Sequence, residues 1–158
     1  LGIAASAMRA ASFVSTGFSI VTTLERTRII AEHLVHAYGM ERFCRRVRAT
    51  DVAVLELEDA TSQARRIVTA ECRRALAEDG SGAIVLGCAG MADLARALAQ
   101  ELGVPVIDGV AVAVKFVEAL VGAGLGTSKK GDLAWPIAKP YGGDLAYLGP
   151  REPTAQRP

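Results

Sequence analysis

AIVLGCAGM, residues 83–91, joins an apolar run to a cysteine that stands between Gly87 and Gly90. The apolar run is typical of a buried strand, and a helical pattern begins near Met91. A strand followed directly by a helix is the building unit of α/β folds, which bind ligands at the carboxyl ends of their strands. We therefore expect Cys88 to lie on a turn that faces a ligand.

Three further strands are predicted around this segment. The run 18–23 is rich in β-forming residues, the arginines of the run 45–50 suggest a sheet edge, and Pro105 suggests that the run 104–107 is an edge or a strand start. Because these strands alternate with helices, the predicted fold class is α/β, an open four-stranded parallel sheet flanked by helices. Helices are predicted over residues 4–15, 25–38, 91–102 and 110–121, and from a cap at Thr61 or Ser62 to Glu78.

The buried faces of two helices follow from the spacing of their apolar residues. In the helix over residues 25–38, the face that we expect to be buried carries Ile30, Leu34, Ala37 and Tyr38. In the helix that ends at Glu78, the predicted stripe consists of Val68, Cys72, Ala75 and Leu76.

Composition excludes several classes of partner. A length of 158 residues suits one domain, and a net charge of +1 gives no electrostatic basis for binding nucleic acid or an anionic membrane. The longest apolar stretch, residues 110–125, is interrupted by Lys115 and Glu118 and is too short to span a bilayer. Three cysteines without paired spacing suit a reducing compartment, so a cytoplasmic location is expected. The helix over residues 110–121 is apolar on most sides and predicts self-association as a homo-oligomer.

Cys88 is the predicted catalytic residue. The start of a helix offers unpaired N–H groups and a partial positive charge, and both favour the reactive thiolate. The flanking glycines let a substrate approach the backbone, where the amides of Ala89, Gly90 and Met91 are placed to hold a carboxylate or a developing oxyanion.

Two threonines are predicted to share the crevice of Cys88. Thr22 and Thr23 end the first strand, and the carboxyl ends of parallel strands meet at one edge of a sheet. Their hydroxyls and amides are therefore candidate substrate ligands, while ordinary strand and N-cap roles remain the alternative.

Other polar residues are better explained by structure. Cys72 lies on a core stripe and is interpreted as packing, and Cys44, in a charged neighbourhood at a strand start, is interpreted as incidental. His33 and His36 have no third ligand near them in sequence, so no metal site is predicted. Asp108 follows the fourth strand, where its two candidate roles are to orient a ligand and to cap the next helix, and capping is the expected one.

These motifs resemble one protein family. Residues 83–91, together with residues 18–23, 103–110 and 127–129, are similar to the aspartate/glutamate/hydantoin racemase superfamily, in particular its hydantoin and allantoin racemase branch. The resemblance implies a cofactor-independent racemase of two α/β lobes, each of which gives one cysteine to a crevice between them. One thiolate removes the α-proton and the opposite thiol returns a proton on the other face. Cys88 matches the cysteine of the second lobe.

The resemblance also implies a domain organisation. Members of the family carry a first lobe before the point that matches Leu1, so we expect this chain to be a fragment or a truncated form that lacks the first cysteine. Residues 1–16 are then a helix leading from that lobe, and residues 17–108 are the α/β lobe with Cys88. Residues 109–126 are an apolar helix returning to the first lobe or to a partner, and residues 127–158 are a Pro/Gly-rich tail.

Three functions follow as hypotheses. The first is a racemase of hydantoins, allantoin or related amino-acid derivatives, an isomerase if the first lobe is present. The second is an arylmalonate decarboxylase-like enzyme or a cis–trans isomerase of the same superfamily. The third is an inactive lobe that binds small ligands or supports assembly. All three imply a small-molecule ligand and no cofactor.

Overall fold

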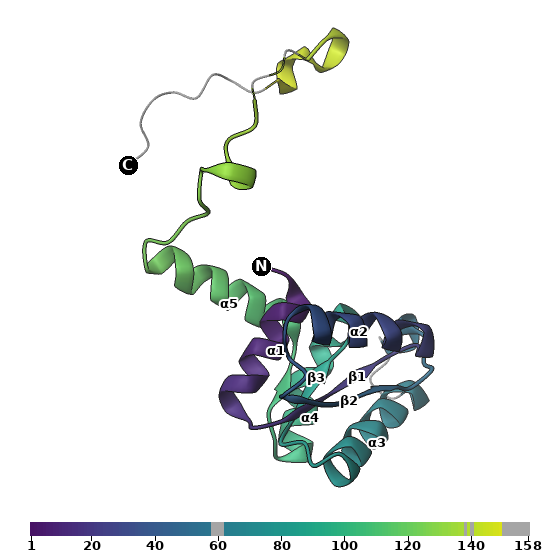
Figure 1. Cartoon of the computed structure of the whole chain (residues 1–158). Coiled ribbons are helices and arrows are strands. Elements are labelled where there is room, and N and C mark those ends of the chain that lie inside the picture. Colours follow the sequence, from purple (N-terminus) through teal and green to yellow (C-terminus); the bar gives the residue numbers. More distant parts are fainter. Residues whose placement is uncertain (58–61, 138, 140, 150–158) are drawn as a thin grey trace. The chain divides into compact units, whose positions relative to one another are not determined.

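A computed structural model describes residues 1–57, 62–137, 139 and 141–149. Its centre is a parallel four-stranded sheet with helices on both faces, which confirms the predicted fold class (Figure 1). The strand order is β2-β1-β3-β4, so the arginine-rich strand β2 lies at an edge as its composition predicts. The strands are β1 (Phe18–Thr22), β2 (Cys44–Ala49), β3 (Ala83–Leu86) and β4 (Val106–Ile107).

The helices lie close to their predicted ranges. They are α1 (Ile3–Val14), α2 (Glu25–Ala37), α3 (Gln63–Glu78), α4 (Ala92–Leu102) and α5 (Gly109–Gly122). Short 3₁₀ helices cover η1 (Val54–Leu57), η2 (Ala89–Met91), η3 (Gly131–Leu133) and η4 (Gly143–Leu148). The Ser62 hydroxyl accepts a hydrogen bond from the Arg65 N–H at the start of α3, as expected of a capping residue, whereas Thr61 lies outside the described residues.

Strand register brings the predicted site residues to one edge of the sheet. Val21 of β1 pairs with Leu86 of β3, and the Gly87 N–H donates to the Val21 carbonyl at 2.8 Å. The strands β1 and β3 therefore end side by side, because all neighbours in this sheet run parallel. Thr22, the last residue of β1, and Cys88, the second residue after β3, therefore belong to the same edge.

Two hydrophobic clusters fill the space on either side of the sheet. One packs α3 and α4 against it, and the other packs α1 and α2. The predicted stripe of α3 is correct, with Val68, Cys72 and Ala75 fully buried and Leu76 partly buried. The predicted face of α2 is partly wrong. Ile30 is 58% exposed, whereas Val35 is buried, so the buried face is rotated along the helix.

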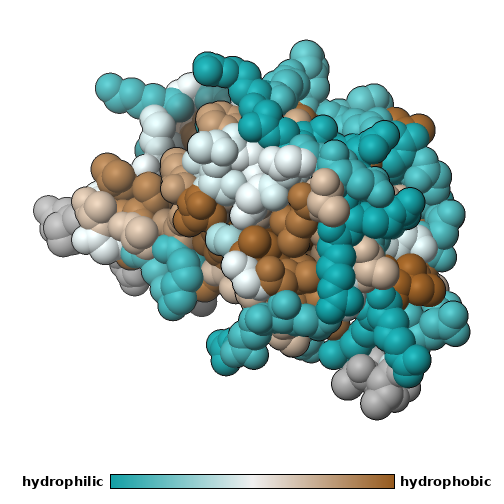
Figure 2. All heavy atoms as spheres, turned by 90° about the horizontal axis from the view of Figure 1, so that it is seen from below, coloured by the Kyte–Doolittle hydropathy of each residue, from teal (hydrophilic) through white to brown (hydrophobic). Residues whose placement is uncertain are grey.

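The α5 helix packs on α1, where the Phe13 and Phe116 rings lie 6.4 Å apart between centroids. Much of its apolar surface stays exposed, including Val114, Val117 and Val121. Figure 2 shows one face of the molecule, on which hydrophobic patches alternate with hydrophilic side chains. Within the described part of the chain, every helix is too short or too polar to cross a membrane.

The chain divides into two compact units, residues 1–123 and residues 124–158. The sheet and its five α-helices belong to the first unit. In the second unit, the Lys129 Nζ atom lies 4.4 Å from the centroid of the Trp135 ring, a cation–π contact. The finer division predicted within residues 1–126 stays a prediction.

Candidate active site

Cys88 is the second residue after β3, directly before η2, and is half-buried. Its backbone is still extended, with φ −143° and ψ 134°, and the 3₁₀ turn begins at the next residue. The expected helix start at Met91 is a 3₁₀ turn that continues directly into α4. Glycine at positions 87 and 90 leaves both sides of the turn exposed.

The three predicted amide donors are not equivalent. The Met91 N–H donates to the Cys88 carbonyl at 3.1 Å, and the Met91 side chain is fully buried in the core. Met91 therefore holds the turn together instead of facing solvent. Ala89 and Gly90 are exposed residues of the same turn. Their position suits them to face a substrate oxygen.

Thr22 lies against the turn, but its hydroxyl is already engaged. The Thr27 hydroxyl donates to the Leu24 carbonyl at 2.6 Å, so the Thr22 hydroxyl, 3.0 Å from the Thr27 oxygen, must be the donor of that pair. Thr22 and Thr23 are 1% and 3% exposed. In this arrangement both threonines lie beneath the surface at the edge of the site. A direct hydrogen bond from Thr22 to a substrate would require the Thr22 hydroxyl to rotate away from Thr27.

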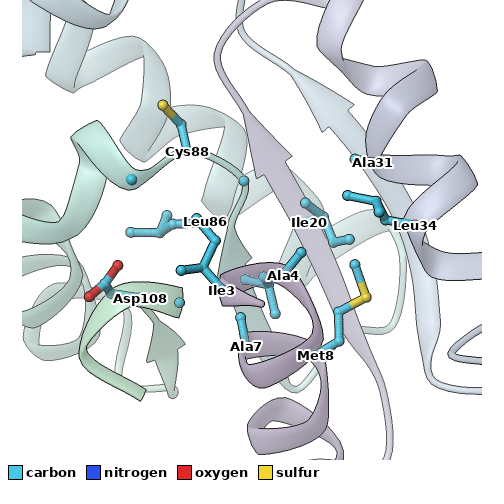
Figure 3. Close-up of a pocket in the computed structure, with 14 residues that line it drawn as sticks. Ile3, Ala4, Ala7, Met8, Ile20, Ala31, Leu34, Leu86, Cys88 and Asp108 are labelled. Atoms are coloured by element: carbon cyan, nitrogen blue, oxygen red, sulfur yellow. The ribbon is translucent and has the colours of Figure 1, made fainter. Parts of the chain in front are cut away.

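A cavity of about 180 Å³ opens beside the turn, between α1, α2, β1 and β3 (Figure 3). Its lining is mainly hydrocarbon, from residues such as Ile3, Met8 and Leu34. The Cys88 side chain points away from these apolar side chains. The cavity beside the turn therefore suits a hydrocarbon group.

Asp108 is the carboxylate at this cavity, and it caps α5 as expected. Its two carboxylate oxygens accept hydrogen bonds from the N–H groups of Val110 at 3.1 Å and Ala111 at 2.8 Å. Only 9% of the residue is exposed. Asp108 thus stabilises the first turn of α5 beside the cavity.

The other two cysteines do not reach the site. Cys72, a residue of α3, is fully buried in the core, and burial raises the pKa of its thiol to about 12. Cys44 begins β2, and burial raises the pKa of its thiol to about 11. Both thiols are therefore protonated at neutral pH, and the burial of Cys72 is consistent with the packing role predicted for it.

Groups of three or more His, Cys, Asp or Glu side chains arranged to hold a metal ion are absent from the described residues. Of the two histidines weighed as ligands, His36 pairs through Nδ1 with Glu41 Oε1 at 2.6 Å.

Sequence reasoning missed one element of the site, the segment 50–54 that follows β2. A side chain added at Gly90 would overlap Val54 Cγ1, so Val54 packs directly on the turn of Cys88. Asp51 lies in the same segment with a positive φ of 52°. An aspartate in this sequence context carries no local signal for that conformation, since the contacts that hold it come from residues far away in the chain.

Gly87 gives a first test of the geometry. A Cβ atom at this position would lie 2.8 Å from the Thr22 Cβ and 3.1 Å from the Thr22 Cα. Because backbone must move to relieve this overlap, Gly87→Ala is expected to reduce the free energy of unfolding by about 1–3 kcal/mol in urea titrations. Gly122→Ala is the matched control, since nothing lies within 4 Å of its Cβ position, and it should leave stability unchanged or slightly higher. Equal effects of both substitutions would contradict the close contact.

Comparison with known proteins adds a family. Residues 1–117 match the model of the Asp/Glu/hydantoin racemase family. The chain is 50% identical over 143 residues to a hydantoin racemase of Rhizobium meliloti, covering 90% of this chain and 59% of that protein. It is 42% identical over 156 residues to a hydantoin racemase of Pseudomonas sp. strain NS671, covering 99% and 63%.

Solved structures agree with these relatives. An allantoin racemase from Klebsiella pneumoniae superposes with a TM-score of 0.85 at 57% identity, covering 96% of this chain and 62% of that chain. An allantoin racemase from Pseudomonas fluorescens superposes with a TM-score of 0.78 at 40% identity, covering 89% and 60%. The chain thus spans about three fifths of the length of the proteins that it matches.

Proposed function

This chain belongs to the Asp/Glu/hydantoin racemase family, and we propose that it supplies the Cys88 half of a cofactor-independent racemase. Its substrates are hydantoins, allantoin or related amino-acid derivatives. The observation that carries the proposal is a half-buried cysteine on a glycine-flanked turn at the carboxyl edge of the sheet. The names of the similar proteins support the same class of substrate.

In the proposed reaction, the Cys88 thiolate removes the proton from the α-carbon of the substrate. The electron pair left on that carbon is delocalised into the adjacent ring carbonyl. Ala89 and Gly90 are exposed residues of the turn, and their amides are the proposed donors to the oxygen on which charge develops. Return of a proton to the opposite face of the carbon completes inversion, so a second acid/base group is required across the substrate.

That second group is not supplied by the other cysteines of this chain. Cys72 is sealed in the core, and Cys44 lies at the start of an edge strand. We therefore place the opposite thiol on a further lobe of the protein, outside these 158 residues. For the opposite enantiomer the two thiols exchange roles, because the group that has given up its proton in one direction is the thiolate that removes a proton in the other.

Substrates with a hydrocarbon group on the reacting carbon fit the site best. The cavity beside Cys88 has a volume of about 180 Å³ and is lined mainly by apolar side chains. Burial of a hydrocarbon group there is favourable.

Deuterium exchange tests the proposal. We expect the chain in D₂O to label the α-carbon of one enantiomer of a 5-alkylhydantoin about 100-fold faster than the enzyme-free blank, as measured by proton NMR. The opposite enantiomer should exchange more slowly, because a single thiol faces only one side of the ring. Blank-level exchange of both enantiomers, with the hydantoin nevertheless bound, would instead identify an inactive binding lobe.

A decarboxylase is the second candidate, favoured by the presence of a single cysteine at this edge of the sheet. A malonate that loses carbon dioxide needs only one proton carrier to quench the carbanion. Release of carbon dioxide from an arylmalonate, without exchange of hydantoin protons, would support this function over racemisation.

The assembly and location of the protein are proposed from its surface and its cysteines. The exposed apolar residues of α5, including Val114 and Val121, favour a homo-oligomer or contact with the further lobe. All three cysteines are free thiols in this structure, which fits the reducing cytoplasm.

A further inference from the structure

Asp51 is the only non-glycine residue with a positive φ in the part of the chain that the structure describes. Left-handed backbone is unfavourable for residues with a Cβ atom, although aspartate tolerates it better than most. Such a conformation persists only where the surrounding contacts hold it. Those contacts identify what Asp51 does.

The carboxylate of Asp51 caps α2 from a distant part of the chain. Its Oδ1 atom accepts a hydrogen bond from the Glu25 N–H at 2.9 Å. The N-cap residue of α2 is Leu24, which has no side-chain oxygen to offer and makes no side-chain cap bond. Asp51 therefore supplies the missing acceptor and ties the end of β2 to the start of α2.

The residues on either side of Asp51 strengthen this connection. The Thr50 N–H lies 3.1 Å from the carbonyl oxygens of both Thr22 and Thr23, and the Thr50 hydroxyl donates to the same two oxygens. The Val52 N–H lies 3.3 Å from the Thr23 carbonyl oxygen. Three successive residues thus bind the loop that follows β1.

The other end of the segment rests on the turn of Cys88. Val54 packs so closely on Gly90 that a Cβ atom there would overlap Val54 Cγ1 and would lie 3.8 Å from the Cys88 Sγ. Residues 50–54, called here the bridging segment, therefore join the threonine loop at one end to the cysteine turn at the other.

We infer that Asp51 is a positioning residue for Cys88: by fixing the bridging segment to the start of α2, it holds Val54 against Gly90 and so sets the turn that presents the thiol. This inference rests on the proposed function only for the role of Cys88. The contacts themselves are independent of any activity.

Amide hydrogen exchange measured by NMR on the 158-residue chain tests the coupling. In Asp51→Gly the backbone conformation is kept but the acceptor is lost, so the Glu25 and Met91 amides should both exchange about tenfold faster. Asp51→Asn keeps an acceptor oxygen and should restore both rates to within about threefold of the wild type. Val54→Ala should accelerate the Met91 amide alone.

Two comparisons make the test specific. Ala53→Gly is the matched control, because it changes an exposed residue of the same segment and keeps the carboxylate and Val54, and it should leave the Met91 amide within about threefold. In the double variant Asp51→Gly/Val54→Ala, the Met91 amide should exchange no faster than in the faster single variant, since both act through one contact.

Faster exchange of Glu25 alone in Asp51→Gly would overturn the inference and leave Asp51 a helix cap only. Uniform acceleration that includes the Val68 amide of α3 would also overturn it, because that pattern reports global destabilisation. With the coupling present, kcat for proton exchange should fall about tenfold in Asp51→Gly and recover in Asp51→Asn. A failure of the proposed function itself is recognised separately, by exchange activity that does not depend on Cys88.

Discussion

Replacing Cys88 with serine should reduce α-proton exchange by a factor of about 100 to 10,000, the contribution typical of a general acid/base group. A serine hydroxyl is nearly the size of the thiol but is far too weakly acidic to carry a proton at neutral pH. The wild-type chain and the Cys88→Ser variant are compared by the rate at which each incorporates deuterium into a 5-alkylhydantoin.

Cys44→Ser is the control for this substitution. Cys44 is also partly exposed, yet it begins β2, away from the carboxyl edge of the sheet where Cys88 lies. Its variant should keep the exchange rate of the wild type. Undiminished exchange after Cys88→Ser would show that another group carries the proton and would end the assignment.

The largest loss of stability is expected from Asp79→Asn. Asp79 is the C-cap residue that follows α3, and its side chain is only 3% exposed. Its Oδ2 atom accepts hydrogen bonds from Arg48 Nε at 2.7 Å and from the Ser19 hydroxyl at 2.8 Å. Removal of the negative charge leaves the buried guanidinium of Arg48 incompletely paired, so urea titrations should show a loss of about 3–5 kcal/mol in the free energy of unfolding.

Glu78→Gln is the matched control, because Glu78 pairs with the same guanidinium at 2.9 Å from an exposed position. The loss of stability in this variant should be much smaller.

The pairing of Asp79 with Arg48 also predicts a pH dependence of stability. Hydrogen bonding to Arg48 holds the pKa of Asp79 below its ordinary value, so this contribution is complete above about pH 4 and is lost as the pH falls through the lowered pKa. Asp79→Asn should lose that part of the acid dependence, and an unchanged acid profile would argue against the buried pair.

The sequence by itself determined the local elements of this protein. The spacing of apolar residues predicted the strands and helices, and capping residues such as Ser62 and Asp108, together with glycines, predicted where helices begin and end. These signals are local, because they act within a few residues of the chain. The same local logic placed Cys88 on a strand-to-helix turn, since an apolar run followed by glycines allows few other conformations.

Only the tertiary structure decided which of the predicted site residues have exposed groups and which are engaged or buried. The Thr22 hydroxyl proton is directed to Thr27, and the Met91 side chain fills the core, both through packing that neighbours in sequence do not specify. The position of Asp51 against Glu25 and the burial of Val35 in place of Ile30 likewise depend on how distant elements meet. Contacts between residues far apart in the chain are set by strand order and helix rotation, and a pattern along one segment carries no information about either.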